Sequence, residues 1–252
     1  MGDPFTRLEV MAVTASRYFR QGTVAFIGTG LPMVAAYLAK ATHAPDVVLV
    51  FESGMIDPRP VDLAPAVGDF RLCYQAAMHA DLFYALRLLQ RGVVDLGILG
   101  AAEVDACGNI NSTVIGDYRH PTVRLPGSGG ANDIASMAKR TLIMLPHERR
   151  KFPERLSYLT SPGHVSGREA LGLPGDGPTA VITDLAVFQF DDSGHARLAR
   201  VHPGVSLEEV QARTGFSFAV DTTVQTSAAP TAEEIRLLRE FIDPDGMYIG
   251  EA

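Results

Sequence analysis

Val47-Val48-Leu49-Val50-Phe51-Glu52-Ser53-Gly54 is the stretch that indicates the fold of this chain most directly. It contains five consecutive apolar residues, then one carboxylate, then a turn of small residues. An unbroken apolar run of this kind is typical of a strand buried on both faces, as in a parallel sheet. Open α/β sheets bind ligands outside the carboxyl ends of their strands. Glu52 is therefore predicted to lie at the ligand-binding edge of a parallel sheet.

The order of the other segments extends this prediction along the chain. Helical spacing predicts helices, and short β-rich runs predict strands. The expected helices are 7–20, 32–41, 81–91 and 133–139, and the expected strands are 23–27, 47–51, 93–99, 141–145, 180–184 and 186–190. Thr231, with Glu234 three residues later, has capping-box spacing and opens a final helix. Repeated units of strand, glycine turn and helix predict an α/β fold with an open, mostly parallel, doubly wound sheet.

Composition argues against several classes of protein. The chain has 252 residues and a formal charge of −7, whereas nucleic-acid binding requires clustered Lys and Arg. No apolar run reaches the roughly 18 residues that span a bilayer, so no membrane association is expected. Two cysteines, Cys73 and Cys107, are too few for a disulfide framework, and we expect a cytoplasmic protein. The seven histidines show no ligand spacing, so we expect no metal site.

Two glycine turns stand between predicted strands and helices. Gly28-Thr29-Gly30-Leu31-Pro32 follows one strand, and the loop from Gly127 to Asp133 precedes a predicted helix. Glycines let backbone N–H groups approach a ligand closely, and such donors suit a phosphate or a developing oxyanion. The alternative is a pair of tight turns whose glycines only supply positive φ, with Asp133 as an N-cap. Gly100-Ala101-Ala102 ends a third strand, and the same edge would then form a narrow crevice for a long, thin ligand.

Glu52 is the first candidate for chemistry at that edge. A carboxylate can act as a general base or as a nucleophile that forms an acyl intermediate. The alternative is a strand-end Glu that caps the next turn or pairs with a surface Arg. The basic run Arg149-Arg150-Lys151 suits either cofactor phosphates or a solvated surface. Cys73 and Cys107 have no evident base beside them and are interpreted as core or turn residues.

Taken in order, these segments resemble the β-type subunit of the family I CoA-transferases, and within that family the glutaconate CoA-transferases. The likeness runs nearly end to end and implies a single domain over 1–252. The segments that carry it are 28–32, His43-Ala44-Pro45-Asp46, Glu52-Ser53-Gly54, Gly108-Asn109-Ile110-Asn111-Ser112-Thr113, Ile115-Gly116-Asp117-Tyr118, 127–132, Thr160-Ser161-Pro162-Gly163, Leu171-Gly172-Leu173-Pro174-Gly175-Asp176 and Asp243-Pro244.

The resemblance implies that CoA moves between an acyl-CoA and a free carboxylic acid by ping-pong chemistry, through a glutamyl-CoA thioester on Glu52. The acid would be a glutaconate-like dicarboxylate or a short acyl group. CoA is then a substrate, and no permanently bound cofactor is expected. The residues expected to bind the oxyanion or CoA are Gly28, Thr29, Gly30, Leu31, Ala101, Gly127, Gly129, Gly130 and Ala131.

The resemblance also implies an α-type partner subunit, in a heterodimer or an α2β2 assembly. Two alternatives remain open at this point. The first is an acyl-CoA hydrolase or decarboxylase on the same fold, because water could intercept the acyl intermediate. The second is a non-catalytic ligand-binding or regulatory subunit, which the acidic charge disfavours.

Overall fold

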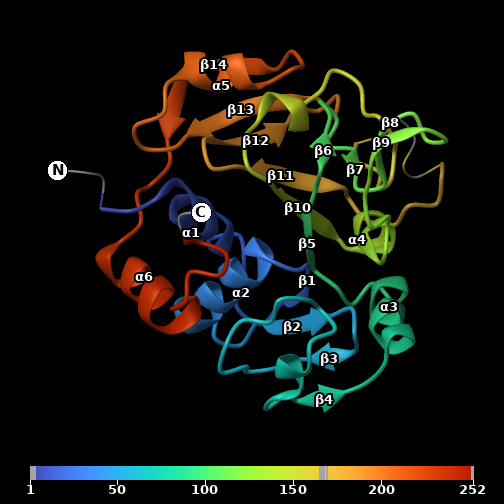
Figure 1. Ribbon diagram of the computed structural model, residues 1–252, viewed down its shortest axis with the longest axis vertical. Coiled ribbons are helices and arrows are strands. Elements are labelled where there is room, and N and C mark those ends of the chain that lie inside the picture. Colours follow the sequence, from blue (N-terminus) through green and yellow to red (C-terminus); the bar gives the residue numbers. More distant parts are fainter. Residues whose placement is uncertain (1–3, 165–167, 169, 251–252) are drawn as a thin grey trace.

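The computed structural model describes residues 4–164, 168 and 170–250, and its centre is one ten-stranded sheet (Figure 1). From one edge to the other the strands are β14 (Ala219–Thr226), β13 (Ala196–Val201), β12 (Ala186–Phe190), β11 (Pro178–Ile182), β10 (Arg140–Met144), β5 (Leu96–Gly100), β1 (Val24–Ile27), β2 (Val48–Phe51), β3 (Met55–Ile56) and β4 (Met78–His79). Two hairpins stand apart from this sheet: β6 (Glu103–Val104) with β7 (Ile110–Asn111), and β8 (Val114–Gly116) with β9 (Pro121–Arg124).

The middle of the sheet is parallel. β11, β10, β5, β1 and β2 pair side by side in one direction, while β12, β13, β3 and β4 add antiparallel pairings toward the edges. Ile27 at the end of β1 pairs with Phe51 of β2 on one side and Ile98 of β5 on the other. The carboxyl ends of β1, β2 and β5 therefore meet at one edge, as the sequence predicted.

Helices cover both faces of the sheet, which confirms the doubly wound prediction. α1 (Arg7–Ser16), α2 (Leu31–Ala41) and α6 (Ala232–Leu237) lie on one side in Figure 1, and α3 (Leu82–Gln90) and α4 (Ala131–Met137) lie on the other. Successive strand residues point to opposite faces. Ala25 and Ile27 accordingly pack in the apolar cluster beneath α1 and α2, whereas Phe26 packs in the cluster beneath α3 and α4.

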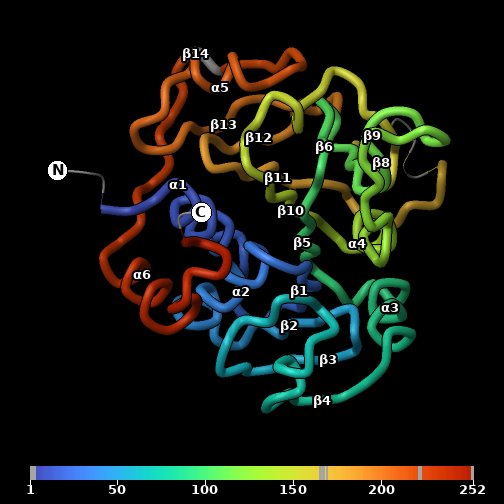
Figure 2. Tube along the Cα trace, in the orientation of Figure 1, coloured from blue at the N-terminus to red at the C-terminus, as the bar shows by residue number. Residues whose placement is uncertain are grey.

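The C-terminal segment returns to the N-terminal helices, as Figure 2 shows where red meets blue. Thr231 and Glu234 form the expected capping box, and a π-helical turn over Leu238–Ile242 extends α6. Arg239 in that turn contacts the buried carboxylate of Glu9 in α1 at 2.6 Å. This contact joins residues 230 positions apart.

The structure differs from the predicted elements mainly where strands are short or edges are irregular. The first helix ends at Ser16 rather than Arg20, because the N–H groups of Tyr18 and Phe19 bond to carbonyls only three residues back. β5 starts at Leu96 rather than Val93, since the N–H of Val93 still bonds to the carbonyl of Leu88 in the last turn of α3. The elements that were not predicted are β3, β4, β6 to β9, β13, β14 and α5 (Leu207–Arg213). Across the described ranges, every helix is too short or too polar to cross a bilayer.

Candidate active site

Glu52 lies directly after β2, at the edge where the parallel strands end. It is half-buried. Gly28 occupies the equivalent position after β1, the neighbouring strand. Ala101 follows β5 at the same edge and packs against the apolar cluster beneath α3 and α4. The topology therefore brings the first glycine turn, Glu52 and Ala101 to adjacent strand ends.

The second glycine loop reaches Glu52 from the other side. The backbone N–H of Gly130 donates a hydrogen bond of 3.1 Å to Oε1 of Glu52. A Cβ on Gly129 would lie 3.4 Å from Oε1, and a Cβ on Gly130 would lie 3.3 Å from Cδ of Glu52 and 3.4 Å from Leu86 of α3. Side chains at these two positions would crowd the carboxylate, and glycines avoid this.

The surroundings of Glu52 do not match a structural carboxylate. Within the described part of the chain, no Lys, Arg or His nitrogen lies within 4.0 Å of it. Its turn is closed by backbone atoms, because the N–H of Gly54 bonds to the carbonyl of Phe51 at 2.9 Å. Glu52 therefore neither pairs with a surface Arg nor caps its own turn, and one carboxylate oxygen carries a single backbone hydrogen bond.

Gly54 fixes the direction in which the chain leaves the site. Its φ is +96°, and a Cβ there would lie 2.5 Å from the backbone carbon of Ala80. The carbonyl of Gly54 accepts a bond from the N–H of Ala80 at 3.0 Å. A glycine is required by both the conformation and the close approach, and it holds the turn after Glu52 against the segment that leads into α3.

In the first glycine turn, Gly28 continues the sheet rather than facing a ligand. Its N–H donates to the carbonyl of Ile98 at 3.1 Å, and a Cβ would lie 2.9 Å from that oxygen. Gly30 has a φ of +87° and begins α2 as its N-cap. Among the residues described, the backbone N–H groups of Thr29, Gly30 and Leu31 have no acceptor. These three donors are available at the same edge as Glu52.

α4 begins two residues earlier than expected, at Ala131, with Gly130 as its N-cap. Asp133 is thus in the first turn and not the N-cap. Gly127 is anchored by Ser112: its N–H donates to the Ser112 carbonyl at 2.9 Å, and Oγ of Ser112 donates to its carbonyl at 2.8 Å. The sequence interpretation assigned no role to Ser112, although the segment 108–113 contributed to the family resemblance.

Two cations of the basic run, Arg150 and Lys151, pair with a neighbouring carboxylate. Glu148 contacts Arg150 at 2.7 Å and Lys151 at 2.8 Å, and hydrogen bonds from these cations, Arg150 first, lower the pKa of Glu148 to about 2.

Burial, followed by the nearby carboxylates of Asp105 and Asp191, raises the pKa of the Cys107 thiol. A protonated thiol is a poor nucleophile, in agreement with the interpretation of Cys107 as a turn residue. Among the described residues, no three His, Cys, Asp or Glu side chains could together hold a metal ion.

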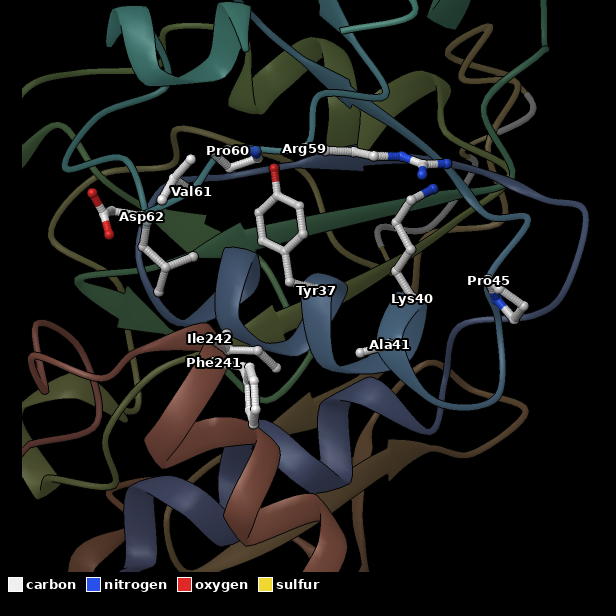
Figure 3. A pocket seen from close by; sticks show the side chains of 11 residues that line it. Tyr37, Lys40, Ala41, Pro45, Arg59, Pro60, Val61, Asp62, Phe241 and Ile242 are labelled. Carbon is white, nitrogen blue, oxygen red and sulfur yellow. The ribbon is translucent and has the colours of Figure 1, made fainter. Parts of the chain in front are cut away.

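A cavity of about 370 Å³ lies away from Glu52, between α2, the loop after β3 and the π-helical turn (Figure 3). Lys40 and Arg59 are among the residues that line it, and both are labelled in Figure 3. Lys40 is already paired within the protein, because its ammonium contacts Asp57 at 2.6 Å and the carbonyl of Val47 at 2.7 Å. No residue of either glycine turn lines this cavity.

Comparison with known proteins gives consistent results. A family model described as coenzyme A transferase matches residues 8–213. The chain is 46% identical over 236 residues to the B subunit of a 3-oxoadipate CoA-transferase from Pseudomonas knackmussii, covering 92% of this chain and 91% of that protein. It is 40% identical over 255 residues to the B subunit of the glutaconate CoA-transferase from Acidaminococcus fermentans, covering 97% and 95%. The crystal structure of glutaconate CoA-transferase from that organism superposes with a TM-score of 0.92 at 38% identity, covering 99% of each chain.

Proposed function

This chain belongs to the coenzyme A transferase family, and we propose that it is the catalytic β-type subunit of an enzyme that moves CoA between an acyl-CoA and a free carboxylic acid. The observation that carries the proposal is the unpaired carboxylate of Glu52, which lies at a parallel strand end and accepts a hydrogen bond from Gly130. The two curated relatives described above are named as transferase subunits, which favours transfer over hydrolysis or decarboxylation.

The first half-reaction uses Glu52 as a nucleophile. A carboxylate oxygen of Glu52 attacks the thioester carbonyl and forms a carbon–oxygen bond. The carbon–sulfur bond then breaks, CoA leaves as a thiolate, and an acyl-glutamyl anhydride remains on Glu52. The thiolate then attacks the glutamyl carbonyl of the anhydride, the carbon–oxygen bond breaks, and the original acid leaves as a carboxylate. Glu52 is left as a glutamyl-CoA thioester. An incoming carboxylate reverses both steps and departs as the new acyl-CoA.

Each step passes through a tetrahedral oxyanion, for which backbone N–H groups are suitable donors. Gly130 already donates to Oε1 of Glu52 and would stay on that oxygen when attack at the glutamyl carbon places negative charge on it. The free N–H groups of Thr29, Gly30 and Leu31 would serve the oxyanion on the substrate side. Removing one donor of this type typically costs about 2.7–4 kcal/mol of barrier.

The CoA arm would run along the small residues at the strand ends, past Ala101 and Ala131. The names of the relatives point to the substrate class, because 3-oxoadipate and glutaconate are both short dicarboxylic acids. We expect a short dicarboxylic acid or its CoA ester here. The relatives are named as B subunits, so an A-type partner is expected in a heterodimer or an α2β2 assembly. We also expect the chain to form one domain over 1–252 and to work in the cytoplasm.

Chemical trapping tests this proposal directly. The assembled enzyme is incubated with glutaconyl-CoA or 3-oxoadipyl-CoA, reduced with borohydride or treated with hydroxylamine, and digested for mass spectrometry. We expect the modification at Glu52 only, dependent on acyl-CoA, and absent in Glu52→Gln. Glu209→Gln, which changes a surface carboxylate paired with Arg7, is the control and should label normally. Turnover that leaves Glu52 unmodified, or full activity of Glu52→Gln, contradicts the proposal.

A further inference from the structure

Thr160, a residue outside the second glycine loop, is hydrogen-bonded to two residues that hold this loop, Ser112 and Asn132. Thr160 is buried, with 7% of its surface exposed, in an irregular segment that pairs with Ile110 of β7. Its hydroxyl lies 2.9 Å from the N–H of Ser112, and its carbonyl lies 2.9 Å from Nδ2 of Asn132. Ser112 holds the start of the glycine loop, and Asn132 lies at its other end, in the first turn of α4. Thr160 therefore bridges the two ends of the loop that presents Gly130 to Glu52.

The first anchor runs through Ser112. Its N–H donates to Oγ1 of Thr160, while its Oγ and carbonyl hold Gly127 at 2.8 and 2.9 Å. The hydroxyls of Thr113 and Thr160 are also 2.7 Å apart. Displacement of the Thr160 hydroxyl would thus be transmitted directly to the backbone at the start of the glycine loop.

The second anchor runs through Asn132. Its Nδ2 donates to the carbonyl of Thr160, and its backbone N–H donates to Oγ of Ser128 at 3.1 Å within the loop. Gly129 and Gly130 lie between Ser128 and Asn132. Gly130 therefore lies between two held points of the chain. Gly127 is held by Ser112, and Asn132 bonds to Ser128; Ser112 and Asn132 both bond to Thr160.

The segment that carries Thr160 is joined to a buried polar network. Asn111 is fully buried and donates to the carboxylate of Glu103 and to the carbonyl of Val114, both at 2.7 Å. The same carboxylate accepts bonds from the N–H and Oγ of Ser157 at 2.9 and 3.0 Å, three residues before Thr160. A buried network of satisfied polar groups has one preferred geometry.

We propose that Thr160 is a positioning residue, whose hydroxyl and carbonyl hold the glycine loop so that the Gly130 N–H meets Glu52. This inference rests on the proposed function, because it concerns the rate at which Glu52 reacts. Loss of the hydroxyl leaves the Ser112 N–H without its acceptor and releases the start of the loop. A displacement of about 1 Å at a reacting group typically costs about 100-fold in rate.

The test compares Thr160→Val with Thr160→Ser in the assembled enzyme. Valine keeps the shape of the threonine side chain but removes its hydroxyl, whereas serine keeps the hydroxyl. We expect Thr160→Val to slow single-turnover formation of the Glu52–CoA thioester by about 10- to 100-fold. CoA affinity should change little, and Thr160→Ser should recover most of the rate. Ser112→Ala, which removes only the bond to the Gly127 carbonyl, should lie between wild type and Thr160→Val.

Thr214→Val is the matched control. Thr214 is also buried, with 4% of its surface exposed, and its hydroxyl bonds to His147 and to the carbonyl of Val210 rather than to a residue of the glycine loop. It should lose stability but keep the thioester rate. Equal rates for Thr160→Val and wild type, or equal losses in Thr160→Val and Thr214→Val, overturn the inference. If Thr160→Val does not fold, an unchanged rate in Ser112→Ala overturns it. Failure of wild type to label at Glu52 instead overturns the proposed function.

Discussion

The backbone N–H of Gly130 lies 3.1 Å from Oε1 of Glu52, although 78 residues separate the two in the chain. Glu52 directly follows β2 of the sheet, and Gly130 is the N-cap of α4, which packs on one face of that sheet. This single bond joins the two sequence motifs that were each ambiguous alone. It also gives the site a donor that is already in place before substrate binds, so that little reorganisation is needed during reaction.

Crowding at this contact should reduce activity more than stability. Gly130 has an ordinary φ of −78°, so Gly130→Ala introduces no backbone strain. The new Cβ would lie 3.3 Å from the Glu52 carboxylate and push it or the loop aside. We expect kcat to fall about 10- to 100-fold. Gly68→Ala, whose Cβ would meet nothing within 4 Å, is the control and should match wild type in steady-state assays.

Gly54→Ala should be far more destabilising than a glycine substitution at an open positive-φ site. Both Gly54 and Gly22 have positive φ, +96° and +69°. A Cβ at Gly22 meets no atom within 4 Å, whereas at Gly54 it overlaps the backbone of Ala80 and Asp81. Urea unfolding should show a loss of about 1 kcal/mol for Gly22→Ala from strain alone and at least about 2 kcal/mol more for Gly54→Ala. Equal losses of unfolding free energy in the two variants would mean that the backbone at Ala80 moves aside at no cost and would contradict this prediction.

Stability should fall as the pH drops from about 6.5 toward 4. Burial lowers the pKa of both His147 and His202 from 6.5 to about 4, and both rings bond to Thr183. Between these values the unfolded chain binds protons that the folded chain does not, so lower pH favours unfolding. Each histidine contributes up to roughly 3 kcal/mol to this loss.

Replacing one of these histidines should flatten the pH dependence. In His202→Gln, urea unfolding at pH 7 and at pH 5 should differ less than in wild type. His43→Gln changes an exposed histidine and should leave the difference as it is. Identical pH slopes in wild type and His202→Gln would show that His202 is charged in the folded protein as easily as in the unfolded one.

Asp243 should be essential for the C-terminal turn. Its carboxylate accepts hydrogen bonds from the N–H groups of Met247, Tyr248 and Ile249 at 2.8–2.9 Å. Tyr248 in turn bonds to the carbonyl of Ala64 at 2.8 Å and lies beside Gly30. Asp243→Ala leaves these donors unpaired and should lower the free energy of unfolding by about 3 kcal/mol. Asp245→Ala, at an exposed neighbouring position, should change it little.

Several features of the site could be predicted from the sequence because they are local. The apolar run before Glu52 is long enough to mark a buried strand, and β2 was found with its end at Phe51. The turn at Gly30 and the capping box at Thr231 were likewise marked by residues adjacent in the chain. β3 and β4 have two residues each and are stabilised only by pairing, so no periodicity marks them.

The sequence by itself therefore determined the parallel core, the strand-end carboxylate and the glycine turns, since each depends on the side chains of consecutive residues. Only the tertiary structure decided which backbone donors are free. The Gly28 N–H is used by Ile98, and the Gly130 N–H faces Glu52. Those pairings depend on the spatial order β5–β1–β2 and on how Thr160 ties the loop to the hairpin. Contacts between residues tens of positions apart are set by packing and hydrogen-bond geometry, which no short stretch of sequence contains.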